Sequence, residues 1–302
     1  MRELLACVAI AGCGAAQTPS TSAAPSIVVE QVGAEPWNVL RFALAPGYEQ
    51  RFELTLKVRA ATTLTNTVLE DDANNLDFPG LVLHMRAKVT AVTPAGDATL
   101  AYEIEGANVL HDVIDPSLRT IAEREATQIR GARSTATRSA NGALSNLRIE
   151  GGSRSQSSQR WLDELQSALG TGDVVFPDAP IGIGASWIVT SHPRIRGIQW
   201  TQIATYTLRD RTETTVDLDK RIEMTAGSQA LRTEPNESIR LTNAVSHSSV
   251  HASLPLTKIA GTVSSEATAE LSYLIVRRHE RLSSTTRIQS ITSTKYLGEP
   301  AP

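Results

Sequence analysis

The chain has 302 residues and a formal charge of -3, with 29 Lys and Arg against 32 Asp and Glu. This near balance excludes a nucleic-acid binder that follows the phosphate backbone with a clustered basic excess. Two Cys are too few for a small domain stabilised by disulfides, and a hydrophobic fraction of 41% is ordinary for a globular protein.

The first thirteen residues predict export. Met1-Arg2-Glu3 precedes an apolar run over 4–11, which Gly12 and Cys13 follow. A charged start, a short apolar run and small residues before a cleavage site are typical of a secretory signal. The run is far shorter than the roughly 20 residues that span a bilayer. We therefore expect residues 1–12 to be a signal peptide.

Ile10-Ala11-Gly12-Cys13 resembles the bacterial lipobox, an aliphatic residue and two small residues before Cys. The resemblance implies cleavage before Cys13 and lipid attachment to its thiol, which leaves no free thiol in the mature chain. In proteobacterial lipoproteins an Asp after the Cys favours the inner membrane, so Gly14 implies an outer-membrane anchor facing the periplasm. The alternative is a soluble protein with a chance Cys, and Glu3 is unusual in a signal.

The residues after Cys13 predict a tether. Gly14 to Ser26 reads GAAQTPSTSAAPS, a small and polar composition that cannot bury enough apolar surface to fold. We expect a flexible spacer over 13–36, followed by a single β-rich domain over 37–302.

Period-two alternation then dominates the chain. Such alternation predicts strands with one buried face. Strands longer than the usual five or six residues, with one polar face, coil into a curved sheet. We therefore predict a mainly β fold, a long-stranded curved antiparallel sheet or open barrel. The alternating segments are 51–59, 81–89, 99–105, 200–208, 216–224 and 267–275, and the turn at 93–97 makes 81–109 a hairpin.

Two short helices interrupt the strands. Asp115-Pro116 supplies a cap and a proline at the first helical position. The second helix is expected over 156–169, where Gly170 ends an apolar stripe. Asn141-Gly142 is typical of a two-residue hairpin turn. The stripe of the first helix is Leu118, Ile121, Ala122, Ala126 and Ile129, and that of the second is Trp161, Leu162, Leu165, Ala168 and Leu169.

The order of elements suggests a duplication. The hairpin at 81–109 can be laid on 198–225, and the hairpin at 130–150 on 257–277. The domain would then consist of pseudo-symmetric halves, 37–172 and 173–302. Because any all-β chain of this size aligns with itself at some offset, the pattern leaves both interpretations open.

The most distinctive segment, 176–187, reads FPDAPIGIGASW. It resembles a P-x-x-P-h-x-h-G-x-x-W element that follows a helix in a family of uncharacterised bacterial envelope lipoproteins. That resemblance implies no activity and assigns no functional residue apart from the lipidated Cys13. Gly182 and Gly184 lack the third glycine and the helix of a phosphate-binding loop. A structural crossover into a strand that begins near Trp187 is the favoured interpretation.

Residues suited to chemistry are sparse. His247 and His251 lie four apart on a strand, roughly 13 Å at ~3.3 Å per residue, which is too far for one metal ion. His84 shares a solvated face with Arg86 and Lys88.

Other candidates also favour structural roles. The acidic run at 70–72 lacks the Gly and the bidentate Glu of a calcium loop. Asp217 and Asp219 lie on a polar strand face, where pairing across strands explains them. The four Trp are expected in the core. We predict no catalytic residue, metal site or cofactor, and no nucleic-acid partner.

Three functions remain. The first is a membrane-anchored lipoprotein that binds or carries an apolar ligand, such as an acyl chain, under a curved sheet with a helix across its mouth; this rests on fold analogy. The second is a structural lipoprotein that binds another envelope protein. An enzyme is the least favoured, because no G-x-S-x-G motif is present and no reactive Cys survives processing.

Overall fold

The computed structural model describes residues 25–65, 72–110, 116–150, 173–234, 237–277 and 280–298, together with 161–162, 164–166 and 168–169. The predicted signal peptide and Cys13 lie outside these residues, as do His111, His279 and the first part of the second predicted helix, 156–160.

Strands make up most of the described chain. The N-terminal part contains β1 (Ser26–Gln31), β2 (Ala34–Asn38), β3 (Glu49–Thr65), β4 (Asp72–Val92), β5 (Ala98–Val109), α2 (Pro116–Ile129), β6 (Arg133–Arg138) and β7 (Leu144–Glu150). The C-terminal part contains β8 (Ile181–Ile183), β9 (Ser186–Ser191), β10 (Arg194–Ile195), β11 (Ile198–Gln199), β12 (Thr201–Arg211), β13 (Thr215–Ala226), β14 (Gln229–Glu234), β15 (Glu237–Pro255), β16 (Thr262–Arg277) and β17 (Glu280–Gly298).

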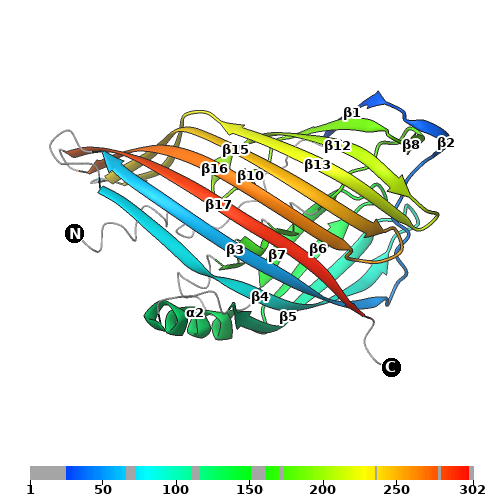
Figure 1. Ribbon diagram of the computed structural model, residues 1–302, viewed down its shortest axis with the longest axis horizontal. Helices are drawn as coiled ribbons and strands as arrows, with labels where there is room; N and C mark the ends of the chain where they lie inside the picture. Colours follow the sequence, from blue (N-terminus) through cyan, green and yellow to red (C-terminus); the bar gives the residue numbers. More distant parts are fainter. Residues whose placement is uncertain are drawn as a thin grey trace.

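Thirteen of the described strands form one antiparallel sheet. Its order is β1-β9-β12-β13-β15-β16-β17-β3-β4-β5-β6-β7, with β14 beside β15. The long strands twist, and the sheet curls until β6 and β7 lie behind the front strands (Figure 1). Within the described residues, β1 and β7 each pair on one side only, so the sheet does not close. The predicted curved, open antiparallel sheet is confirmed.

The predicted hairpins are also present. β4 pairs with β5 over the segment expected at 81–109, and β12 pairs with β13. The turn between β6 and β7 is longer than the predicted two residues, because Ser139 N donates to Ala143 O and encloses three residues. Gly142 has a φ of 100°, in the region that favours glycine. A Cβ at Gly142 would also overlap the carbonyl oxygen of Val174, so the turn packs against residue 174.

The expected boundary between spacer and domain is wrong. β1 lies inside the segment 13–36 and β2 begins within it, and β1 pairs with β9 from Ser26↔Thr190 to Gln31↔Ser186. The sheet therefore begins at Ser26 rather than at residue 37. The short run Ile27-Val28-Val29 is apolar without alternation, and its pairing partner lies about 160 positions further along the chain, so no local pattern marks it as a strand.

The suggested duplication predicts that 130–150 and 257–277 have the same structure, and they do not. The segment 130–150 forms the hairpin β6–β7, whereas 257–277 contains the single long strand β16. Both predicted halves contribute to the same sheet, because β17 pairs with β3 from Ser283↔Thr65 to Gly298↔Arg51.

The helices are confirmed where they are described. α2 begins at Pro116, and its buried residues Ala122, Ala126 and Ile129 match the predicted stripe. The prediction that Leu118 and Ile121 belong to the buried stripe is wrong, because both residues are exposed. Helical backbone also occurs over 161–169 where the chain is described, and Trp161 Nε1 donates to Glu125 Oε2 of α2 at 2.8 Å. Among the described residues, no helix combines the length and apolar character that a bilayer crossing requires.

Two separate hydrophobic cores lie on the inner face of the sheet. The first core fills one end and includes Phe52 of β3, Val263 of β16 and Phe176. The second core is smaller and lies towards the other end of the strands. It consists of Ile198, Trp200, Ala226, Leu241, Ala244 and Leu271.

Candidate functional site on the inner face of the sheet

Four adjacent strands present small side chains between the two cores. On β16, Val263 belongs to the first core and Leu271 to the second, and inward positions between them include Ala267 and Ala269. Their outward neighbours Thr268 and Glu270 are exposed, as period-two alternation requires. We call the partly exposed inward residues Ala60, Ser246, Ser248, Ala267, Ala269 and Ser290 the inner wall.

The register places the inner wall in two neighbouring rows across the sheet. Ala60, Ile288, Ala269 and Ser246 form one row through successive pairings. Ser290, Ala267 and Ser248 form the next row. Ile288 is the one large side chain in these rows. Alanine methyls and serine hydroxyls therefore offer a surface that is partly apolar and partly hydrogen-bonding.

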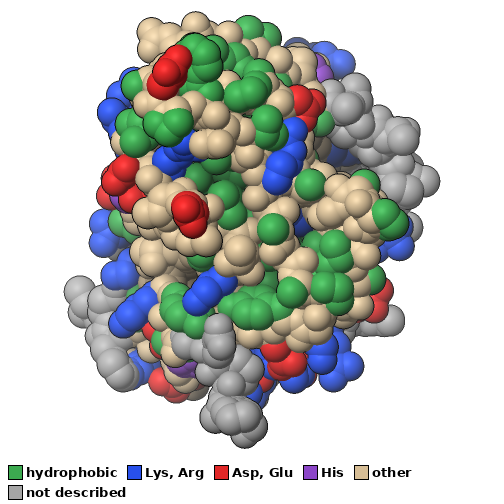
Figure 2. Space-filling model, turned by 90° about the vertical axis from the view of Figure 1, so that its right-hand side faces the viewer, with side chains coloured by type: hydrophobic (Ala, Val, Ile, Leu, Met, Phe, Trp, Pro, Cys, Tyr) green, Lys and Arg blue, Asp and Glu red, His purple; other side chains and the backbone are tan. Residues whose placement is uncertain are grey.

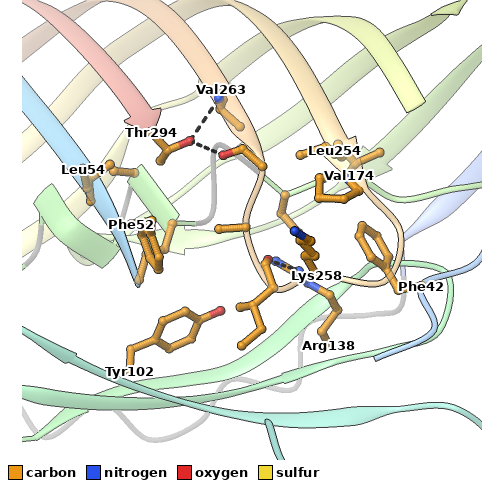
Figure 3. Close-up of a pocket in the computed structure, with 17 residues that line it drawn as sticks. Phe42, Phe52, Leu54, Tyr102, Arg138, Val174, Leu254, Lys258, Val263 and Thr294 are labelled. Atoms are coloured by element: carbon orange, nitrogen blue, oxygen red, sulfur yellow. Dashed lines mark hydrogen bonds between the residues drawn. The ribbon is translucent and has the colours of Figure 1, made fainter. Parts of the chain in front are cut away.

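A small, partly open cavity lies at the end of the sheet that the first core fills. Its volume is about 60 Å³, and Phe52, Tyr102, Arg138 and Lys258 are among its lining residues (Figure 3). Pockets for small-molecule ligands usually measure roughly 300–1,000 Å³, whereas one water takes about 30 Å³. This cavity has room for water but not for an acyl chain.

The loop 256–261 between β15 and β16 forms part of the wall of this cavity. Fully buried Gln50 fixes the loop, because its Nε2 donates to Ala260 O at 2.7 Å and its Oε1 accepts from Ile259 N and Ala260 N. Thr294 Oγ1 donates to Gly261 O and accepts from Val263 N, both at 3.0 Å (Figure 3). The loop is therefore held by side chains from β3 and β17.

Two opposite charges, Asp173 and the buried Lys220, lie near each other at the same end. Lys220 is 3% exposed, and its Nζ donates to the backbone oxygen of Asp173 at 2.8 Å. The Lys220 ammonium also lies 5.3 Å from the ring centroid of Tyr206, which stacks on Trp187 at 5.1 Å. Asp173 Oδ2 accepts from Leu144 N at 2.7 Å. These contacts hold the segment at 173–176 inside the curved sheet.

Burial shifts the pKa of both charged groups. Desolvation raises the pKa of Asp173 to about 6, although the positive charges of Arg138 and Lys220 act in the opposite direction. Desolvation lowers the pKa of Lys220 to about 8, and the charge of Asp173 partly offsets this effect. Burial also raises the pKa of Tyr102 and of Tyr206.

Perturbed pKa values often mark functional sites, but the surroundings of Lys220 favour a structural role. The Lys220 ammonium is engaged by Asp173 O and the Tyr206 ring, and it is not among the described residues that line the cavity. Lys220 was not among the residues singled out from the sequence, although it follows Asp217 and Asp219 in the same strand. Position 220 shares the inward phase of buried Val216, Leu218 and Ile222, so the alternation already indicated burial.

The other residues considered from sequence lie apart from this pair. Asp219 accepts from Arg209 and pairs with His251, and these contacts hold the pKa of Asp219 below its ordinary value. His84 pairs with Glu53 on the outer face, as predicted for a solvated position. In the part of the chain that the structure describes, no three His, Cys, Asp or Glu side chains converge as metal ligands would.

The segment at 176–187 forms the predicted crossover. β8 pairs with β2, and β9 begins at Ser186, next to the buried Trp187. A Cβ at Gly182 would overlap the carbonyl oxygen of Ala34, so this glycine allows the close approach of the two strands. Trp161, Trp187 and Trp200 are buried as expected, but Trp37 is 49% exposed, so the core assignment of this fourth Trp is wrong.

Comparisons with known proteins add no functional assignment. No protein-family model matches the chain, and no curated protein matches it either. The geometry of the inner face and the sequence therefore carry the functional argument.

Proposed function

We propose that this chain is a membrane-anchored envelope lipoprotein that binds a small apolar or amphipathic molecule on the inner wall. The observation that carries this proposal is the surface between the two cores, where four long strands present mostly Ala and Ser, with Ile288 the one large side chain. A sheet of this size gains stability by filling its interior, and small, partly exposed side chains forgo that gain. A bound apolar group would recover it.

The chemistry of the inner wall indicates the class of ligand. Ala60, Ala267 and Ala269 offer apolar contact, as does the neighbouring Ile288, whereas Ser246, Ser248 and Ser290 offer hydroxyls. A lipid-like molecule with an apolar chain and a polar group satisfies both. The cavity of about 60 Å³ is too small for this ligand, so we assign binding to the inner wall and not to that cavity.

Ligand binding is tested with the full chain purified from membranes. We expect native mass spectrometry to detect a co-purifying lipid and the apolar probe N-phenyl-1-naphthylamine to bind. Ala267→Trp should abolish both signals, because the indole occupies the space in front of the inner wall that the ligand would take. Thr268→Trp is the matched control, since it adds the same side chain one residue away on the exposed face. Circular dichroism verifies that both variants fold.

Two results contradict ligand binding. One is a folded wild-type chain without lipid or probe, and the other is equal loss of binding in both Trp variants. If cross-linking in intact cells instead captures one dominant protein while the interior remains empty, the structural or partner-binding role replaces the proposal.

Membrane anchoring is tested separately through Cys13. We expect the wild-type chain to fractionate with membranes and its mature N-terminus to carry acyl chains. Cys13→Ser should release the chain into the soluble fraction. If wild type and variant fractionate alike and both retain residues 1–12, the anchor is rejected.

A further inference from the structure

Half of the exposed large hydrophobic side chains gather at one end of the molecule. The described chain exposes ten such residues, and five of them lie on β1, β2, β8 and the adjoining turns. We call these five the end patch: Val28, Val32, Trp37, Val39 and Ile183. Contiguous exposed apolar surface on a soluble domain usually marks a site of contact with another phase or partner.

Strand pairing and side-chain contacts hold the residues of the end patch in fixed positions. β2 pairs with β8 through Ala34↔Ile183, and Gly182 N donates to Val32 O at 2.8 Å. Trp37 lies against Gly182, where an added Cβ would come 3.1 Å from the Cδ1 atom of the indole. The indole N–H donates to Gly33 O at 3.1 Å. Because its polar atom is satisfied within the protein, Trp37 presents an apolar ring outwards.

Polar groups border the end patch. Arg211 Nη2 donates to Pro36 O at 2.6 Å, and Arg41 pairs with Asp178. Figure 2 views this end of the molecule, where hydrophobic side chains reach the surface with charged side chains of both signs among them. Apolar residues with an aromatic side chain and a charged border suit the interfacial region of a bilayer, where Trp is enriched.

The position of the end patch along the chain identifies its occupant. Pro25 immediately precedes β1, and Cys13 lies twelve residues before Pro25. Twelve residues reach at most about 40 Å when fully extended. If Cys13 carries the lipid anchor, as the proposed function requires, β1 and the adjoining end patch are held close to the membrane surface.

We propose that the end patch rests on the lipid bilayer to which Cys13 is attached. This inference depends on the anchor of the proposed function, but not on ligand binding at the inner wall. Contact with lipid fixes the orientation of the sheet, with the end formed by β2 and β8 towards the membrane (Figure 1).

Trp37 provides the test, because Trp161, Trp187 and Trp200 are buried. The full lipidated chain is reconstituted into phosphatidylcholine vesicles with brominated acyl chains. The Trp37 signal is the difference in emission between wild type and Trp37→Phe. We expect brominated lipid to quench most of this signal, and acrylamide access to fall severalfold relative to the Cys13→Ser chain in solution.

Ile291→Trp in the Trp37→Phe background is the matched control. Residue 291 is exposed on the outer face of β17, six strands from β1 in the sheet. Its added indole should remain open to acrylamide and escape brominated lipid.

The outcomes separate the two proposals. A chain that floats with the vesicles while Trp37 stays unquenched by lipid overturns the docking inference and leaves the anchor intact. A chain that does not float overturns both. If p-benzoylphenylalanine at position 37 cross-links one protein in intact cells instead of lipid, a protein occupies the end patch and the inference fails.

Discussion

At the scale of single residues, the neighbouring charges of Asp173 and Lys220 are the most unusual feature of the interior. Opposite charges withdrawn from water seldom stabilise a fold more than apolar residues of the same shape, because desolvation offsets the attraction. Here the two residues also satisfy backbone groups, since Lys220 donates to Asp173 O and Asp173 accepts from Leu144 N. Their role is to position the segment at 173–176 against the sheet.

The raised pKa of Asp173 predicts how stability depends on pH. The unfolded carboxyl titrates near 3.8 and the folded one at about 6, so the folded state binds more protons between these values. The free energy of unfolding therefore falls as pH rises from 4 to 6. In Asp173→Asn this contribution disappears, and the variant should gain up to about 3 kcal/mol relative to wild type across that window. Urea unfolding at a series of pH values measures the difference.

Asp178→Asn is the control, because it makes the same change at an exposed carboxylate. Its stability profile should run parallel to that of wild type. A pH-independent difference between Asp173→Asn and wild type would show that Asp173 ionises normally in the folded protein.

Lys220 makes the free energy of unfolding depend on pH in the alkaline range as well. Its folded pKa of about 8 lies below the ordinary value of 10.5, so the unfolded state binds more protons between the two. Stability from this group therefore rises as pH increases from 8 to 10.5, and Lys220→Met should lose that rise. If the unfolding free energy of wild type and Lys220→Met changes equally over this range, the lowered pKa is wrong.

At the scale of elements, the loop 256–261 depends on a side chain distant in sequence. Gln50 bonds three backbone groups of that loop. Gln50→Leu keeps most of the volume but leaves these groups without their partner inside the protein. We expect this variant to lose about 2–4 kcal/mol in urea unfolding, because each buried unsatisfied group costs roughly 1–3 kcal/mol.

Gln289→Leu on the exposed face of β17 is the control and should change stability by less than about 0.5 kcal/mol. Equal effects of the two substitutions would mean that Gln50 does not secure the loop.

Strand patterns predicted six of the thirteen strands of the large sheet, but neither the central strand β17 nor the contacts across the sheet. Alternation identified β3, β4, β5, β12, β13 and β16 because one face of each is buried and the other solvated. Gln50 and Ala260 are more than two hundred residues apart, so no local pattern links them. The inner wall was also unpredictable, since Ala and Ser at strand positions indicate neither burial nor ligand contact until the register aligns them.

At the scale of the whole molecule, one continuous sheet links both predicted halves. β17 pairs with β16 on one side and with β3 on the other along its length. We therefore expect a single cooperative unfolding transition, with coincident urea curves from far-UV circular dichroism and from fluorescence of the buried Trp residues. Two separated transitions, or a segment 173–302 that folds alone, would contradict this view.

The central position of β17 also constrains the order of assembly during biosynthesis. β3 lacks one of its two neighbours, and β16 likewise, until residues 280–298 have been synthesised. During that interval both strands have long edges with unpaired backbone N–H and C=O groups, which can pair with strands of other nascent chains. We therefore expect truncation just before residue 280 to yield aggregates rather than a smaller folded product.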